Sequence, residues 1–283
     1  MSTLDKKMKF SVSIAVYKND QSLFFKRALE SVFNQSIMPS EVVLIVDGPV
    51  PERTQKIIMD FELKYKNLLV VRLENNVGHG EARRIGLDHC QNELVALMDS
   101  DDLSLPDRFE KQLKCFEDND NLSVVGGQIT EFINTPENIV GLRLLPTEDK
   151  KIKQYLKSRC PFNQMTVMFK KSDVLLSGGY KDWYQDEDYY LWIRMYLNHS
   201  IFKNIEDTLV NVRVSNDLYG RRGGFKYFKS ESKLQYFMWQ QNIISLPRLI
   251  FNVNVRFAIQ ILLPNNVRAI LFQKLFRKSI KNE

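Results

Sequence analysis

Along the first hundred residues, short apolar runs alternate with segments in which apolar residues recur at helical spacing. Short, nearly continuous apolar runs predict buried strands over residues 10–16, 41–46, 68–73 and 93–98. Between these runs the apolar residues recur at helical spacing, for example at Phe25, Leu29 and Phe33. Regular alternation of strand and helix is typical of a mostly parallel sheet with helices on both faces, so we predict an α/β fold.

The second half of the chain has longer and less regular segments. We expect helices over residues 106–118, 172–176 and 186–198, a long strand over 122–133 and a strand over 165–169. The polar, lysine-rich stretch 134–159 shows no clear periodicity and receives no assignment.

Polar side chains follow each predicted strand of the first half. They are Tyr17, Asp47, Asn76-Val77-Gly78 and Asp99-Ser100-Asp101-Asp102. The carboxyl ends of parallel strands meet at one edge of an open α/β sheet, and ligands bind at that edge. The sequence therefore predicts a binding site there.

Three carboxylates crowd the end of the strand over 93–98, at Asp99, Asp101 and Asp102. Their mutual repulsion becomes tolerable when a hard divalent cation such as Mg²⁺ or Mn²⁺ lies between them. The alternative is a solvated turn that caps the following helix, because Asp and Ser favour such positions. Both interpretations remain open at this point.

Asp188 belongs to the inward-facing stripe of the predicted helix over 186–198. It shares that stripe with Leu191, Trp192 and Met195. The helix dipole favours its ionised form and a cleft wall favours its protonated form, and this balance suits a general base. The alternative is a capping Asp paired with Arg194 or Lys181.

The composition is that of an ordinary globular protein: 283 residues, 44% hydrophobic and 26% charged, with a net charge of +6. The region 248–283 carries seven Lys or Arg against Glu283 alone, so the rest of the chain is formally neutral. This confined excess argues against a nucleic-acid-binding surface and for a local anionic partner. Three widely spaced cysteines and three histidines form no zinc-ligand pattern, and residues 1–9 lack the apolar core of a secretory signal. We therefore expect reduced thiols and a cytoplasmic protein.

The region 244–283 interleaves these cations with apolar residues, and Pro264 precedes a further predicted helix. One interpretation is a basic amphipathic helix that lies on an anionic membrane surface. The other is that its apolar faces pack on the domain itself.

Several motifs, taken in order, resemble the family 2 glycosyltransferases, which have the GT-A fold. The motifs are Val12-Ser13-Ile14-Ala15-Val16-Tyr17, Val46-Asp47-Gly48, Asn76-Val77-Gly78, Ala82-Arg83-Arg84-Ile85-Gly86, Asp99-Ser100-Asp101-Asp102 and Glu187-Asp188 with Leu191-Trp192-Ile193-Arg194. The resemblance spans residues 8 to about 215 and is greatest to bacterial members that build O-antigen and capsule repeats. It implies a catalytic domain over 1–215, with a nucleotide-binding half over 8–105 and an acceptor-binding half over 106–215. A flexible loop and a helical, basic extension would then occupy 216–283.

The resemblance also implies a role for each matching residue. Tyr17 would stack near the nucleotide base, Asp47 would accept a hydrogen bond from its imide, Arg83 would lie near the diphosphate and Asp99 would hold the ribose. The complete implied donor-binding set is Ala15, Val16, Tyr17, Asp47, Asn76, Gly78, Arg83, Asp99 and Ser100. Asp101 would bind Mg²⁺ or Mn²⁺ with Asp102 as a second ligand. Asp188 would be the general base, and Glu187 would position the acceptor or the base.

Some positions depart from the family pattern. Val46 stands where many members have Asp, and Arg84 stands where Asn is common. Asn163-Gln164 occupies a place where relatives often carry His. Arg213 and the loop 219–224 could form a mobile phosphate-binding flap, or the loop could be a plain surface loop.

The resulting expectation is an inverting glycosyltransferase of surface polysaccharide biosynthesis. It would transfer a sugar from a nucleoside-diphosphate sugar, UDP above all, to a saccharide acceptor that is lipid-linked at the inner face of the membrane. A dinucleotide-dependent oxidoreductase is disfavoured, because Arg83 stands where a third glycine should follow Gly78-His79-Gly80. A sugar-nucleotide nucleotidyltransferase would need a glycine-rich loop after the first strand, and a catalytically silent nucleotide-sugar-binding scaffold remains an alternative.

Overall fold

The computed structural model describes residues 8–214, 223–264 and 267–268. Within these residues a nine-stranded mixed sheet has the strand order β3-β2-β1-β4-β8-β6-β9-β5, and β7 pairs with β6 outside that path. The strands are β1 (Phe10–Tyr17), β2 (Glu41–Asp47), β3 (Leu68–Arg72), β4 (Leu94–Met98), β5 (Leu103–Ser104), β6 (Leu122–Phe132), β7 (Ile139–Arg143), β8 (Met168–Lys170) and β9 (Ile201–Arg213). The helices are α1 (Ser22–Phe33), α2 (Glu52–Lys64), α3 (His79–His89), α4 (Arg108–Asp118), α5 (Asp149–Leu156), α6 (Lys171–Leu176), α7 (Glu187–Leu197), α8 (Phe225–Gln240) and α9 (Leu246–Phe257).

The first four strands form the parallel sheet that the sequence predicts. β1 pairs in parallel with both β2 and β4, and β2 pairs in parallel with β3. β4 then pairs with β8, which is antiparallel, and thereby joins the two predicted halves of the catalytic domain in one sheet. The division at residue 105 and the boundary at 215 remain predictions.

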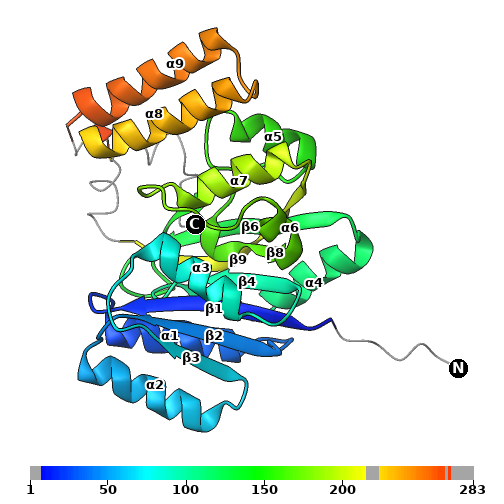
Figure 1. The fold of residues 1–283 in the computed structure, drawn as a ribbon. Coiled ribbons are helices and arrows are strands. Elements are labelled where there is room, and N and C mark those ends of the chain that lie inside the picture. The colour runs from blue at the N-terminus through cyan, green and yellow to red at the C-terminus, as the bar shows by residue number, and fades with distance from the viewer. Residues whose placement is uncertain (1–7, 215–222, 265–266, 269–283) are drawn as a thin grey trace, which may run out of the picture.

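Helices cover both faces of the sheet (Figure 1). One core contains apolar residues of α1, α2 and α4, among them Phe25, Ile58 and Phe109. The other contains residues of α3, α5, α7 and α8, among them Leu87 and Trp192. Two apolar layers on one sheet explain why the strand sequences are nearly continuous apolar runs.

The second half differs from the sequence prediction in three places. The predicted start of the strand over 165–169 is wrong, because a short 3-10 helix (Gln164–Thr166) precedes β8 (Met168–Lys170). The unassigned stretch 134–159 contains β7 and α5. The longest strand, β9, was not predicted. Its burial alternates at both ends, but the exposed pair Glu206-Asp207 and the buried pair Leu209-Val210 interrupt the period-two pattern in the middle.

α8 and α9 form a helical hairpin beside α7, at the opposite end of the molecule from α1 and α2 (Figure 1). A π-helical turn (Ala258–Leu262) follows α9. In the described residues no helix is both long and apolar enough to cross a membrane. The predicted helix after Pro264 lies largely outside the described residues.

Candidate active site

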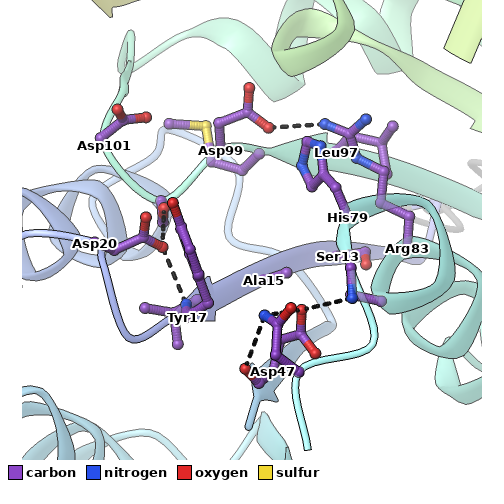
Figure 2. A pocket seen from close by; sticks show the side chains of 16 residues that line it. Ser13, Ala15, Tyr17, Asp20, Asp47, His79, Arg83, Leu97, Asp99 and Asp101 are labelled. Carbon is purple, nitrogen blue, oxygen red and sulfur yellow. Dashed lines mark hydrogen bonds and ion pairs between the residues drawn. The ribbon is translucent and has the colours of Figure 1, made fainter. Parts of the chain in front are cut away.

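The first cavity lies at the carboxyl ends of β1, β2 and β4 and at the amino end of α3, and has a volume of about 430 Å³. All nine predicted donor-binding residues line it, together with Asp101. Figure 2 shows Asp20 and Asp101 on the opposite side of this cavity from Arg83. The convergence follows from the topology, because parallel strands deliver their carboxyl ends to one edge.

Asp47 organises the floor of the first cavity. Its side chain is buried, and its carboxylate accepts hydrogen bonds from the backbone N–H of Val77 (2.7 Å) and from Asn76 Nδ2 (2.8 Å). The next residue, Gly48, has φ +82°, and a Cβ there would lie 2.7 Å from Asn76 N. Only glycine therefore allows β2 to end this close to the loop that carries Asn76 and Gly78.

Tyr17 and Asp20 form the rim on the β1 side. The Tyr17 ring is partly exposed, at 38% of the residue surface, and stands beside the cavity (Figure 2). Asp20 accepts hydrogen bonds from Tyr17 N (3.1 Å) and from Ser100 Oγ (2.7 Å), and so joins the β1 and β4 loops. Burial in turn raises the Asp20 pKa. Asp20 was not predicted as a site residue, because a single Asp in a polar stretch after β1 gives no distinguishing signal.

A buried arginine connects the first cavity to α7. Arg83 is 8% exposed; its guanidinium lies 3.1 Å from Asp99 Oδ1 and 3.3 Å from Glu187 Oε1. His79 Nδ1 also lies 3.3 Å from Glu187 Oε1, and His79 lines the cavity. The hydrogen bond from His79 and the charge of Arg83 outweigh burial and lower the Glu187 pKa. His79 was not predicted as a site residue, although its place directly after Gly78, at the start of α3, was a usable signal.

Asp101 is the carboxylate best placed for a cation. Desolvation by the surrounding protein, and then the negative charges of Asp99 and Asp20, raise the pKa of Asp101 to about 6. A divalent cation would relieve this crowding of like charges, so the donor set fits a hard metal ion. In the described chain no three His, Cys, Asp or Glu side chains converge on one point, so a metal ion at Asp101 would take further ligands from phosphate oxygens and water.

Asp102, the predicted second metal ligand, does not line the first cavity. Its residue is 2% exposed, and Oδ1 accepts a hydrogen bond from the backbone N–H of Arg213 (2.9 Å). Asp102 thus fixes the end of β9 to the β4 loop. Arg213 is held at that end as well, because its guanidinium packs over Phe24 (3.7 Å) and Phe132 (4.6 Å). The structure places Arg213 at the end of β9, and residues 219–222 of the predicted loop lie outside the described residues, so the phosphate-binding flap stays a prediction.

Asp188 faces a second cavity of about 360 Å³, formed by residues 158–165, the amino end of α7, α8 and α9. Its Oδ1 accepts a hydrogen bond from Tyr189 N (2.6 Å), and the Cys160 thiol lies 3.8 Å from Oδ2. Burial, then the charge of Glu187, raises the Asp188 pKa, and Arg83 opposes this rise. A carboxylate with a raised proton affinity at a cavity wall can act as a base.

The alternative of a capping pair with Arg194 or Lys181 is wrong. Arg194 donates to the carbonyl oxygens of Ser177 (2.5 Å) and Gly179 (2.7 Å), and no ion pair joins Asp188 to Lys181 among the described residues. Glu187 and Asp188 thus sit between two cavities.

The remaining departures from the family pattern have structural explanations. Arg84 pairs with Glu81 and Asp88 on the outer face of α3, both at 2.6 Å. Asn163 is 1% exposed and donates to the Gly127 carbonyl (2.8 Å). Gln164 lines the second cavity and donates to the Tyr180 hydroxyl (3.0 Å).

One face of α9 packs on the domain, as one of the two interpretations of the tail predicts. Asn252 donates to the Lys157 carbonyl (3.0 Å), and Arg256 donates to the Ser158 carbonyl (2.7 Å) and pairs with Glu231 of α8 (3.4 Å). The other face exposes large apolar side chains: Leu246, Ile250, Phe251, Val255 and Phe257. Packing on the domain therefore accounts for one face of α9. The membrane interpretation still applies to the exposed face.

Comparisons with known proteins identify relatives of this chain. A family model described as Glycosyl transferase family 2 matches residues 11–175. An uncharacterized glycosyltransferase of Haemophilus influenzae is 38% identical over 271 residues, which cover 96% of this chain and 100% of that protein. The UDP-Gal:alpha-D-GlcNAc-diphosphoundecaprenol beta-1,3-galactosyltransferase of Escherichia coli is 36% identical over 270 residues, which cover 95% of this chain and 97% of that protein. The amylovoran biosynthesis glycosyltransferase AmsE of Erwinia amylovora is 37% identical over 229 residues, which cover 80% and 84% respectively.

Solved structures share the fold. The crystal structure of S. aureus TarS 1-349 has a TM-score of 0.65 and 18% sequence identity, over 89% of this chain and 72% of that chain. Its complex with UDP has a TM-score of 0.59 and 20% identity, over 84% and 73%. The predicted fold class, a mostly parallel sheet flanked by helices with helices at the carboxyl-terminal end, is confirmed.

Proposed function

The chain belongs to glycosyltransferase family 2, and from this premise we propose that it transfers a sugar from a UDP-sugar to a hydroxyl of a lipid-linked saccharide, with inversion at the anomeric carbon. One observation carries the proposal: the amino end of α7 places Glu187 against the residues of the first cavity and Asp188 in the second cavity. A transferase needs its base beside the acceptor hydroxyl and next to the donor site, and the neighbouring positions of Glu187 and Asp188 support that role for Asp188.

The first cavity is the proposed donor site. Tyr17 offers a partly exposed ring for stacking on the base, and the Asp47 carboxylate retains lone pairs for the imide N–H after its bonds to residues 76–78. Arg83 supplies a buried positive charge next to Asp99, where the diphosphate and the ribose would lie. UDP as the nucleotide is supported by the E. coli relative, which is named for its use of UDP-Gal.

Members of this family generally depend on a divalent metal ion, and Asp101 is the residue proposed to hold Mg²⁺ or Mn²⁺. Such an ion would offset the negative charge that develops on the departing diphosphate. Asp102 is not proposed as a direct ligand, because its side chain is buried and does not line the first cavity.

The proposed reaction is a single displacement. Asp188 takes the proton of the acceptor hydroxyl as that oxygen forms a bond to the anomeric carbon. The bond from this carbon to the phosphate oxygen breaks, and the nucleoside diphosphate leaves with the electron pair. Glu187 holds Arg83 and His79 in place and its negative charge keeps the proton affinity of Asp188 high.

The acceptor is proposed to be lipid-linked and to belong to surface polysaccharide biosynthesis, in line with the relatives from E. coli and E. amylovora. The exposed apolar face of α9 and the cations of residues 244–283 would hold the protein at an anionic membrane surface. The proposed location is the cytoplasmic face of that membrane.

The proposal is tested by incubating the protein with Mn²⁺, a panel of UDP-sugars and a panel of saccharide diphosphate lipids. Metal-dependent release of UDP that requires an acceptor, with a new glycosidic bond of inverted configuration in the product, supports it. Binding of UDP-sugars without transfer to any acceptor would favour a nucleotide-sugar-binding scaffold instead.

A further inference from the structure

The first cavity offers little free positive charge to an anionic donor. Its described lining residues include one arginine, Arg83, and four carboxylates, which are Asp20, Asp47, Asp99 and Asp101. Arg83 is already paired with Asp99 (3.1 Å) and with Glu187 (3.3 Å). A diphosphate is itself an anion, so a further cation beside the proposed metal ion at Asp101 would favour its binding. Among the described lining residues only His79 can become positively charged in addition to Arg83.

His79 is the first residue of α3 and stands at the wall of this cavity. Arg83 follows four positions later, so the two side chains lie on the same face of the helix. Figure 2 shows both on the same side of the cavity. His79 Nδ1 lies 3.3 Å from Glu187 Oε1, the atom that also pairs with Arg83, while 59% of the His79 side chain is exposed. The imidazole is therefore anchored at one nitrogen and accessible from the cavity.

The contact with Glu187 determines where the imidazole carries a proton. Burial raises the Glu187 pKa, but the hydrogen bond from His79 and the charge of Arg83 outweigh it, so the carboxylate is ionised and can only accept. Nδ1 must then be the donor in this contact. In a neutral imidazole the other nitrogen, Nε2, has no proton, and no described residue binds it. A phosphate oxygen is also an acceptor, so it can bind Nε2 only when the ring gains a second proton.

The charges around His79 decide how readily the ring gains that proton. The Arg83 guanidinium and the positive end of the α3 dipole oppose the gain. The carboxylates that face His79 or line the same cavity favour it. They are Asp20, Asp47, Asp99, Asp101, Glu187 and Asp188. A diphosphate bound beside His79 would add negative charge and shift this balance toward the imidazolium.

We propose that His79 is a donor-binding residue, whose Nε2 donates a hydrogen bond to a non-bridging oxygen of the diphosphate, and that it takes up a proton from solvent when the donor binds. This hydrogen bond is charge-assisted, since both partners are ionised. It strengthens as the sugar leaves, because the electron pair of the broken bond adds negative charge to the diphosphate, while the proton stays on His79. The inference rests on the proposed function, since it adds a residue to the donor side of the same reaction.

The first test is calorimetric binding of UDP and of uridine in the presence of Mn²⁺. His79→Asn keeps an amide N–H near the position of Nδ1 for Glu187 and removes Nε2. It should weaken UDP binding by about tenfold and leave uridine binding unchanged, because uridine has no phosphate. His89→Asn changes the other histidine of α3, which is exposed at the far end of the helix, and should leave the affinity for UDP as it is.

The second test repeats the UDP titrations in buffers with different heats of ionisation, which measures the protons taken up on binding. At about pH 7.5 the terminal phosphate of UDP is already ionised, so its own titration contributes little. The wild-type protein should take up part of a proton for each UDP bound, and His79→Asn should lose this uptake. His79→Lys carries a permanent charge and should restore UDP affinity without the uptake. Thermal unfolding establishes that each variant is folded, and His79→Gln serves where the Asn variant does not fold.

Equal UDP affinity or equal proton uptake in His79→Asn and the wild-type protein would overturn the inference. An equal loss of affinity for UDP and for uridine would also overturn it, since His79 would then only hold Glu187 in place. None of these results would touch the proposed function, which depends on UDP binding and sugar transfer. A protein that takes up the proton at His79 but transfers no sugar would refute the proposed function alone, and a wild-type protein that binds no UDP would refute both.

Discussion

Glu187 and Asp188 are consecutive in the first turn of α7, yet their carboxylates meet different surroundings. Glu187 Oε1 lies 3.3 Å from both Arg83 and His79, which line the first cavity, whereas Asp188 lines the second cavity. Adjacent helical positions point about 100° apart, so one helix terminus can supply a group to each cavity. The pair therefore links the binding of donor to the proposed activation of acceptor.

Replacement of Asp188 by Asn should remove the base and keep the volume of the side chain. We expect kcat to fall by a factor of about 10²–10⁴, because a positioned base contributes that much. UDP affinity should stay close to that of the wild type, because Asp188 does not line the first cavity. Turnover and calorimetric UDP binding are the two measurements; substantial turnover in the variant would remove the assignment of the base.

The pH dependence of kcat should report the raised pKa of Asp188. The base works only when ionised, so kcat should fall as the pH drops through a value above 3.8, the ordinary value for Asp. Glu187→Gln removes a charge that raises this pKa, and the acid limb of the profile should therefore move to lower pH. An acid limb that stays in place in this variant would show that Asp188 does not titrate there.

Asp101 and Asp102 should behave differently although they are neighbours. Asp101→Asn should weaken Mn²⁺-dependent UDP binding, because its carboxylate lines the first cavity. Asp102→Asn should leave that dependence intact, since the amide oxygen can still accept the hydrogen bond from Arg213 N. UDP titrations with and without Mn²⁺ measure both, and loss of metal dependence in the Asp102 variant alone would reverse the assignment.

Gly48→Ala should destabilise the protein and weaken donor binding together. The new Cβ would lie 2.7 Å from Asn76 N, and the residue would keep an unfavourable φ of +82°. We expect the free energy of unfolding to fall by about 1–3 kcal/mol. Denaturant unfolding measures the loss, and a variant as stable as the wild type would show that the loop moves aside without cost.

Exposed apolar residues of α9 and of the π-helical turn that follows it should mediate membrane binding. Ile250 and Leu262 are 54% and 63% exposed, and changing both to Ser should weaken binding to vesicles that contain phosphatidylglycerol by about tenfold or more. Leu63→Ser on α2, where the side chain is 77% exposed, is the matched control. If the wild-type protein does not bind these vesicles in a flotation assay, the exposed face serves another purpose.

The sequence predicted the first half of the fold well because its signals are local. Continuous apolar runs marked the strands, and the residues that follow those strands, from Tyr17 to Asp101, indeed gather at one cavity. Topology alone brings them together, so no long-range information was needed.

The features that were missed depend on contacts between distant segments. Nothing local in Asp102 reveals that its carboxylate binds the backbone of Arg213, 111 residues away. β9 was not predicted because the alternation of buried and exposed residues is interrupted in its middle. The second cavity was not predicted because it forms only where α9 packs against the loop at Ser158. Contacts between distant segments determine these features, and the periodicity of the sequence does not reveal such contacts.

The most direct test of the account is a crystal structure of the protein with UDP and Mn²⁺. The account predicts that uracil lies between Tyr17 and Asp47 in the first cavity, that Mn²⁺ binds Asp101 and the diphosphate, and that Asp188 faces the second cavity. UDP in the second cavity, or a metal ion held away from Asp101, would contradict it.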